Sequence, residues 1–183
     1  MKTLILGGVR SGKSRYAGEI ARELACPVTL IATATVLDDE MASRIATHRA
    51  NRPAGWAVVE EPIHLAAALV AAARPNAVVI VDCLTLWLTN LLCGDDQGAL
   101  RRELRALTET LAALPGHCLL VTNEVGFGII PANELARRFA DEAGTLHQGL
   151  AALCDRVVLM AAGLPISVKD RASVPANQPP DVP

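Results

Sequence analysis

Short runs of Val, Ile and Leu alternate along the chain with longer stretches in which Ala, Leu and Arg recur at helical spacing. A short apolar run predicts a buried strand, and apolar positions three and four residues apart predict an amphipathic helix. We therefore expect strands within residues 3–6, 28–34, 56–62, 77–85, 117–125 and 156–169. We expect helices over residues 12–25, 38–50, 63–73, 98–113 and 133–153.

This alternation of strands and helices indicates an α/β fold, with a mostly parallel sheet and helices on both faces. Residues 78–81 are apolar throughout, as a central strand covered on both faces should be. Gly163-Leu164-Pro165 interrupts the last apolar run, so we expect a terminal hairpin there. Residues 1–170 are expected to form a single domain, and the Pro-rich residues 171–183 a flexible tail.

Composition narrows the possible ligands. The 183 residues are 51% hydrophobic, enough for one well-buried core, but only 3% aromatic, and the net charge is -2. Nucleic-acid binding needs a basic surface and is not expected. The stretch Ala77–Cys93 is interrupted by Asp82 and Asn90, so no membrane span is expected. The five cysteines include no C-x-x-C pair, which suits reduced thiols in a soluble cytoplasmic protein.

A phosphate-binding motif lies near the start of the chain. Its pattern is G-x-x-x-x-G-K-[ST], and it lies between a predicted strand and a predicted helix. Backbone N–H groups of such a loop point at a β-phosphate, the lysine bridges the β- and γ-phosphates, and the serine hydroxyl ligates Mg²⁺. A glycine-rich turn without a ligand is the structural alternative. The residues concerned are Gly7, Gly8, Val9, Arg10, Ser11, Gly12, Lys13 and Ser14.

Acidic residues follow two other predicted strands. Asp82 ends the run 78–81 and is expected to hold Mg²⁺ together with Ser14, or otherwise to cap a helix. Glu60 and Glu61 form a second acidic strand end that either reaches metal, ribose or base, or is solvated at the surface. These parts predict a Mg²⁺-dependent nucleoside triphosphate site but do not say what the nucleotide is used for.

A histidine among arginines is the second chemical signal. His48 shares a predicted helix face with Arg44, and Arg49 and Arg52 follow directly. Guanidinium groups grip phosphate in bidentate fashion, and a neutral imidazole can attack phosphorus to give a phosphoramidate. A surface histidine near a helix C-terminus has the same pattern, so spacing alone leaves both interpretations open.

Several sequence blocks together resemble the bifunctional adenosylcobinamide kinase / adenosylcobinamide-phosphate guanylyltransferase family of cobalamin biosynthesis. The P-loop is generic, whereas R-I-x-x-H-x-x-x-R-P-x-x-W and N-E-V-G-x-G-I-x-P are distinctive of that family. The blocks occur in the family's order and cover nearly the whole chain to about residue 169. They are residues 7–14, 31–41, 44–56, 82–92 and 122–151.

The resemblance implies a RecA-like P-loop fold, a homotrimer and two reactions. In the first, a nucleoside triphosphate phosphorylates the hydroxyl of the aminopropanol arm of adenosylcobinamide. In the second, His48 attacks the α-phosphorus of GTP, and the resulting histidine-GMP passes GMP to the phosphate, giving adenosylcobinamide-GDP. By the same matching, the nucleotide site is lined by the P-loop and by Thr33, Ala34, Thr35, Arg49, Ala50, Asn51, Arg52, Glu60 and Asp82.

The small-molecule partners implied are GTP, ATP and adenosylcobinamide, with Mg²⁺ as cofactor and with His48 and Lys13 as catalytic residues. The acceptor site rests on the resemblance alone. The loop Asn123–Gly128 follows a strand end and faces the corrinoid or a neighbouring subunit, or is a structural turn. The alternative function is a P-loop small-molecule kinase without guanylyl transfer, and a nucleotide-dependent switch is the third possibility.

Overall fold

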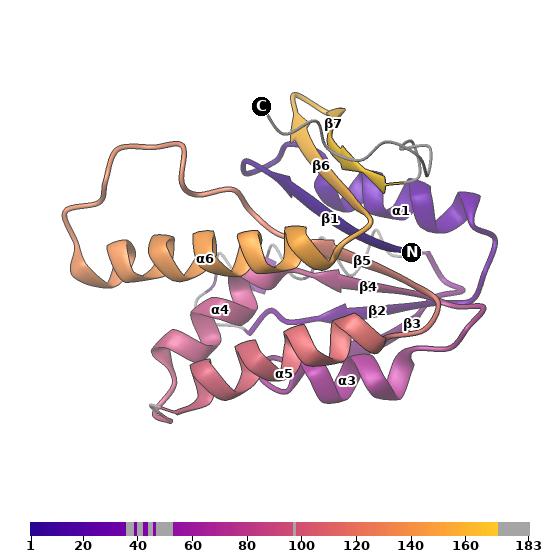
Figure 1. Ribbon diagram of the computed structural model, residues 1–183, viewed down its shortest axis with the longest axis horizontal. Coiled ribbons are helices and arrows are strands. Elements are labelled where there is room, and N and C mark those ends of the chain that lie inside the picture. Colours follow the sequence, from indigo (N-terminus) through magenta and orange to yellow (C-terminus); the bar gives the residue numbers. More distant parts are fainter. Residues whose placement is uncertain (36–38, 40–41, 44–45, 47–52, 97, 172–183) are drawn as a thin grey trace, which may run out of the picture.

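The computed structural model describes residues 1–35, 39, 42–43, 46, 53–96 and 98–171 (Figure 1). Its strands are β1 (Lys2–Gly7), β2 (Val28–Ala32), β3 (Ala57–Glu60), β4 (Val78–Asp82), β5 (His117–Val121), β6 (Arg156–Ala161) and β7 (Leu164–Asp170). Its helices are α1 (Lys13–Glu23), α3 (Leu65–Ala72), α4 (Leu84–Cys93), α5 (Ala99–Ala113) and α6 (Glu134–Leu153).

The strands form one seven-stranded sheet in the order β3-β2-β4-β5-β1-β6-β7. Every neighbouring pair is parallel except β6 and β7, which are antiparallel. The hairpin between them turns at Ala162 and Gly163, which both have positive φ. The expected α/β fold, with a mostly parallel sheet and a terminal hairpin, is confirmed.

Helices cover both faces of the sheet, as the alternating pattern predicts. On one face α1 packs against β1, β4 and β5 and buries apolar side chains such as Ala17 and Ile20. On the other face α3, α4, α5 and α6 form a larger core that includes Leu65, Trp87 and Leu150 (Figure 1). The central strands are therefore buried on both sides, which explains their continuous apolar sequence, whereas β3 at one edge is exposed.

Helix α4 was not predicted. The sequence pattern predicts strand structure to residue 85, but β4 ends at Asp82 and a helix begins at Leu84. The N-cap, Cys83, makes no side-chain capping bond, so the helix start has no polar signal. Its buried residues recur with helical spacing, but the run around them is almost wholly apolar and hides that spacing. They are Leu84, Trp87, Leu88 and Leu91.

Parallel strands bring their carboxyl ends to one edge of the sheet, where ligands of open α/β folds bind. The P-loop follows β1 at this edge, and Asp82 ends β4 there. The long connection between β5 and α6 leaves the same edge and projects at the left of Figure 1. None of the described helices is long and apolar enough to cross a membrane.

Candidate functional site

The loop between β1 and α1 has the backbone shape that its glycines predict. Gly12 caps α1 with φ 96°, a conformation that a residue with a side chain adopts only under strain. A Cβ at Gly7 would lie 2.6 Å from the carbonyl oxygen of Met160, so glycine is also required where β1 passes β6. The chain therefore turns tightly from strand to helix and leaves the first N–H groups of α1 available for phosphate.

Lys13 is held inside this loop. Its ammonium group donates a hydrogen bond of 2.6 Å to the carbonyl oxygen of Gly8, and the residue is only 8% exposed. Burial lowers the pKa of Lys13, whereas the neighbouring Cys83 and Asp82 raise it. The ammonium group thus lies folded over the loop, where it is positioned to contact the β- and γ-phosphates of a bound nucleotide.

Ser14 and Asp82 meet as predicted. The Ser14 hydroxyl donates to Oδ1 of Asp82 over 3.4 Å, bringing together two oxygens from the first turn of α1 and the end of β4. Magnesium is held in nucleotide sites by one or two protein oxygens together with phosphate oxygens and water. The described residues contain no cluster of three or more His, Cys, Asp or Glu that would make an all-protein metal site. The pair therefore fits Mg²⁺ that arrives with a nucleotide.

Thr33 links the end of β2 to the residue after Asp82. Its hydroxyl donates to the carbonyl oxygen of Cys83 over 2.7 Å and accepts from the N–H of Cys83 over 3.0 Å. Thr33 is fully buried. Its two hydrogen bonds fix the backbone of Cys83 and thereby help to position the neighbouring Asp82. Ala34 and Thr35 follow at the same edge and are half-buried. That the segment 33–35 lines the nucleotide site stays a prediction.

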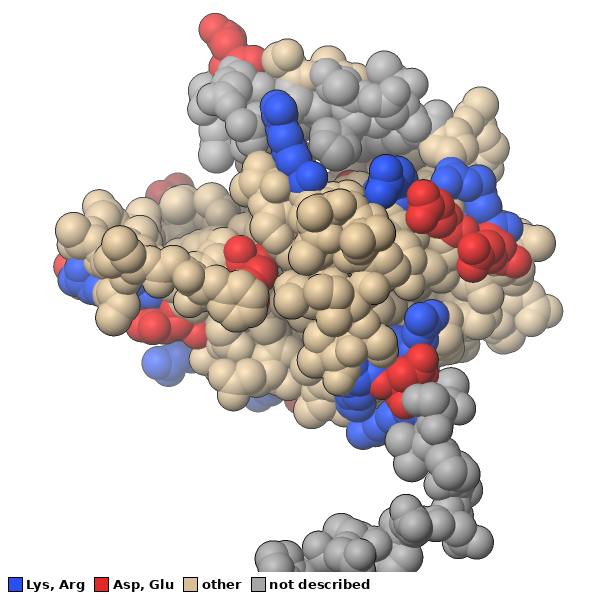
Figure 2. All heavy atoms as spheres, turned by 90° about the horizontal axis from the view of Figure 1, so that it is seen from above, with Lys and Arg blue, Asp and Glu red and all other residues tan. Residues whose placement is uncertain are grey.

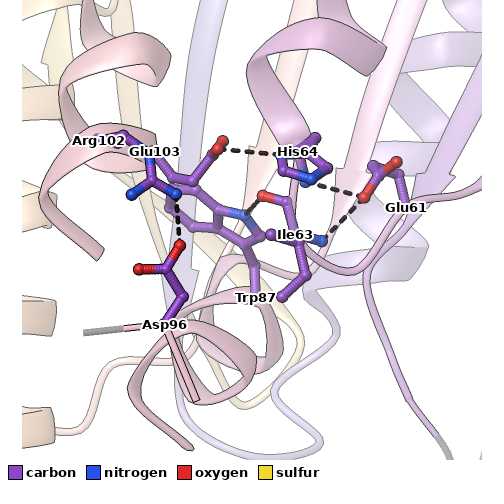
Figure 3. A network of polar contacts seen from close by, with 7 residues as sticks. All are labelled: Glu61, Ile63, His64, Trp87, Asp96, Arg102 and Glu103. Atoms are coloured by element: carbon purple, nitrogen blue, oxygen red, sulfur yellow. Dashed lines mark hydrogen bonds and ion pairs between the residues drawn. The ribbon is translucent and has the colours of Figure 1, made fainter. Parts of the chain in front are cut away.

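The two acids after β3 differ in their surroundings. Glu60 is exposed at the end of β3, opposite Ala32 of β2. Glu61 fixes the turn that leads into α3, because its Oε1 accepts the N–H groups of Ile63 and His64 over 2.9 and 2.8 Å. The Glu61 carboxylate therefore has a structural task (Figure 3).

Further polar contacts near Glu61 connect the turn before α3 to α4 and α5 (Figure 3). The indole N–H of Trp87 donates to the carbonyl oxygen of Ile63 over 2.8 Å, and Nδ1 of His64 lies 3.0 Å from Oε1 of Glu103. At the far end, Arg102 donates to Asp96 over 2.8 Å. These contacts hold α4, which begins at Leu84, two residues after Asp82.

The predicted histidine site lies outside the described residues. His48, Arg49, Ala50, Asn51 and Arg52 all fall there. Within the expected helix over residues 38–50, the described positions 39, 42, 43 and 46 are helical.

The two flanks of the segment that carries His48 are described. Before it, Asn90 of α4 donates to the carbonyl oxygen of Thr33 over 2.8 Å and accepts the hydroxyl of Thr35 over 3.0 Å. After it, Trp56 packs beside Gly18 of α1. The described residues before this segment thus lie beside α4, and Trp56 after it lies beside α1.

Sequence reasoning missed a polar network at the end of β5. Nε2 of His147 lies 2.9 Å from Oγ1 of Thr122, which lies 3.3 Å from Oγ1 of Thr85. The N–H of Asn123 donates to Thr85 over 2.7 Å, and Nδ1 of His147 lies 3.9 Å from Oε2 of Glu124. The polar residues that follow β5 were the available signal in the sequence. Their partners, on α4 and α6, lie far from them along the chain.

The chain was compared with known proteins. Residues 3–168 match the family described as cobinamide kinase / cobinamide phosphate guanyltransferase. The chain is 54% identical over 169 residues to the bifunctional adenosylcobalamin biosynthesis protein CobP of Pseudomonas aeruginosa, covering 92% of this chain and 98% of that one. It is 41% identical to the bifunctional adenosylcobalamin biosynthesis protein CobU of Escherichia coli, covering 92% of this chain and 100% of that one.

One solved structure, of a protein from Pyrococcus horikoshii OT3, has a TM-score of 0.54 at 9% identity. It covers 92% of this chain and 86% of that one. At that identity the likeness concerns the fold alone.

Proposed function

Because the chain belongs to the cobinamide kinase / cobinamide phosphate guanyltransferase family, we propose that one nucleotide site at the carboxyl edge of the sheet serves both reactions. The protein is a bifunctional transferase of cobalamin biosynthesis with a P-loop. The single observation that carries the proposal is the geometry of Lys13, Ser14 and Asp82 around that loop. Adenosylcobinamide is the proposed acceptor, with ATP and GTP as the nucleotides.

In the kinase step, residues 7–14 bind the triphosphate through their backbone N–H groups. Lys13 leaves the carbonyl oxygen of Gly8 and turns to the β- and γ-phosphates, where it stabilises the charge that develops as the γ-phosphoryl group leaves. Ser14 and Asp82 would hold Mg²⁺, which when bound neutralises charge on the phosphate oxygens. The acceptor hydroxyl attacks the γ-phosphorus, and the nucleoside diphosphate departs.

In the guanylyl step, His48 is the proposed nucleophile. A neutral imidazole nitrogen attacks the α-phosphorus of GTP, the bond to pyrophosphate breaks, and a histidine-GMP intermediate forms. The phosphate of adenosylcobinamide phosphate then takes the GMP and frees the histidine. Arg49, Ala50, Asn51 and Arg52 line the nucleotide in this proposal, and the P-loop stabilises the departing pyrophosphate.

We also propose that the protein works as a cytoplasmic homotrimer. Support for an assembly comes from the loop after β5, where Phe127, Ile129 and Ile130 are 83, 97 and 80% exposed. The part of the molecule that carries this loop projects at the left of Figure 2, where most of its surface is uncharged. Exposed apolar patches of this kind mark interaction sites. Light scattering coupled to size-exclusion chromatography measures the mass directly, and a monomer at micromolar concentration would contradict the trimer.

The proposed function is tested by following label from the α-phosphate of GTP. The protein is incubated with Mg²⁺ and labelled GTP, denatured, and analysed for acid-labile label. We expect label on the wild type and none on His48→Ala. His64→Asn is the matched control, because His64 is exposed and faces Glu103 rather than the P-loop, and it should keep the label.

Phosphorylation of cobinamide by ATP is measured in parallel. A wild type that phosphorylates cobinamide but never carries label would make the protein a P-loop kinase without guanylyl transfer. A wild type that does neither would contradict the proposed function as a whole.

A further inference from the structure

The polar network after β5 runs from two hydroxyls to an imidazole. Thr85 accepts the N–H of Asn123, and its hydroxyl lies 3.3 Å from that of Thr122, where either oxygen can be the donor. Oγ1 of Thr122 lies 2.9 Å from Nε2 of His147, and it donates there when that nitrogen carries no proton. A neutral imidazole that accepts at Nε2 carries its proton on Nδ1. That proton faces the carboxylate of Glu124, at 3.9 Å.

Burial favours the neutral form of this histidine. His147 is 9% exposed, and desolvation lowers its pKa, while the Glu124 carboxylate acts in the opposite direction. Thr122 is 1% exposed. The chain of hydroxyls and imidazole is therefore held by packing between β5, α4 and α6, and it ends on a carboxylate at the edge of the sheet.

Glu124 lies beside the P-loop. Its N–H donates to the carbonyl oxygen of Gly7 over 3.0 Å, which continues the pairing of β5 with β1. Oε1 of Glu124 accepts the N–H of Gly126 over 2.6 Å. Oε2 lies 3.9 Å from Nδ1 of His147, beyond hydrogen-bond distance, and no hydrogen bond to Oε2 is found in the described part of the chain. One carboxylate oxygen next to the phosphate loop is thus available to accept a proton.

The other acids of this edge have different tasks. Asp82 contacts Ser14 at the proposed metal position, and Glu61 holds the turn before α3. Glu60 ends β3, an edge strand separated from β1 by β2, β4 and β5. Of these acids in the described part of the carboxyl edge, Glu124 is the one whose backbone bonds the P-loop glycine Gly7.

An apolar cavity of about 410 Å³ is lined in part by Val125, the residue after Glu124. Its walls come from α4, the loop after β5 and the first turns of α6, including Thr89, Leu92, Val125 and Phe139. Thr89 is one turn from Thr85, and Val125 follows Glu124 directly. A bulky acceptor can rest an apolar part of its surface against these walls while its hydroxyl arm extends toward the P-loop.

We propose that Glu124 is the general base of the kinase step and that His147 is a positioning residue that orients it. The inference rests on the proposed kinase activity. The acceptor oxygen forms a bond to the γ-phosphorus as the bond from that phosphorus to the β-phosphate bridging oxygen breaks. The hydroxyl proton passes to Oε2 of Glu124, and the bridging electron pair leaves with the nucleoside diphosphate. Glu124 returns the proton to solvent after release.

The first test replaces the carboxylate without removing its loop contact. Glutamine at position 124 still accepts the N–H of Gly126 but cannot take a proton. For Glu124→Gln we expect kcat of cobinamide phosphorylation to fall about 100-fold or more, because general bases contribute about 10²–10⁴ to rate. The KM for ATP should stay near the wild-type value, and Glu124→Asp should recover part of kcat. Glu109→Gln removes the same charge from an exposed site on α5 and serves as the control.

The second test separates the two nitrogens of His147. Asparagine places an amide N–H near the position of Nδ1, whereas glutamine reaches the position of Nε2. If orientation of Glu124 is what matters, His147→Asn keeps more of kcat than His147→Gln. Equal losses in the two variants would contradict the positioning role. Thermal unfolding of both variants shows whether they are folded.

Labelling by α-labelled GTP distinguishes this inference from the proposed function, since the labelling step involves no acceptor hydroxyl. The inference predicts that Glu124→Gln loses far more phosphorylation than labelling. A Glu124→Gln enzyme with unchanged kcat would overturn the role as base, and equal loss of both activities would indicate a structural role and overturn it too. A wild type without any phosphorylation of cobinamide would instead contradict the proposed function.

Discussion

Replacing Thr33 by valine tests how the metal-binding end of β4 is held. The substitution keeps the shape of the side chain and removes the hydroxyl that joins β2 to Cys83 by two hydrogen bonds, of 2.7 and 3.0 Å. Thr33 is fully buried, so water cannot easily replace the lost hydroxyl. Because Cys83 follows Asp82 directly, the variant should also weaken Mg²⁺-dependent nucleotide binding.

The structure sets the size of the effect on stability. The carbonyl oxygen of Cys83 also accepts the N–H of Trp87 over 3.2 Å, so it keeps one partner in the variant. The N–H of Cys83 loses its hydroxyl partner. An unpaired buried donor costs about 1–3 kcal/mol, and the lost bond to the carbonyl about 1 kcal/mol more. Thr33→Val should therefore lower the free energy of unfolding by about 2–4 kcal/mol.

Urea unfolding followed by circular dichroism measures this change, with Thr33→Ser as the matched control. Serine keeps both hydrogen bonds and removes one methyl group, which costs about 1 kcal/mol. We expect the valine variant to unfold at a clearly lower urea concentration than the serine variant. If Thr33→Val is as stable as Thr33→Ser, the two hydrogen bonds do not brace this junction and the reasoning is wrong.

Two further predictions concern the core and the thiols. Trp87→Phe removes the donor to the carbonyl oxygen of Ile63 and leaves space in a fully buried position, so it should cost about 2–4 kcal/mol of unfolding free energy by urea titration. A loss below about 1 kcal/mol would show that the indole bond is not needed. Burial raises the pKa of Cys118 and Cys154 to about 12, so neither forms thiolate near neutral pH. In a maleimide time course the exposed Cys93 should react first, and equally fast labelling of the buried pair would contradict their burial.

The phosphate loop could be predicted from sequence because its signal is local. Gly7, Gly12, Lys13 and Ser14 lie within eight residues, and each acts through the backbone shape or through reach from a single turn. The pairing of Ser14 with Asp82 also followed, since parallel strands bring their ends to one edge. The alternation of apolar runs was sufficient for the sheet and the terminal hairpin.

Helix α4 and the network after β5 could not be predicted in the same way. The capping residue of α4 is Cys83, which makes no side-chain bond, and the run that follows is apolar on nearly every side of the helix. The contact between Thr122 and His147 spans 25 residues and depends on how α6 packs over β5. Nothing in the sequence around His147 indicates its partners, because those partners are chosen by tertiary packing.

The order of strands separates the parts proposed for the two reactions. At the carboxyl edge, Thr33 at the end of β2 leads to the segment that carries His48, and Glu124 follows β5 beside the P-loop. Asp82, on β4, lies between β2 and β5 in the sheet. In the proposed function, the histidine acts on the α-phosphorus and the acceptor on the γ-phosphorus of the same bound triphosphate.

It follows that variants should divide into three groups. Substitutions at Lys13 or Asp82 change the cradle that both reactions use, so they should reduce GTP labelling and phosphorylation together. Changes at His48 should abolish labelling alone, and changes at Glu124 should reduce phosphorylation alone. Because the proposal gives each reaction its own residue, a variant at Glu124 that spares phosphorylation but stops labelling would contradict the division.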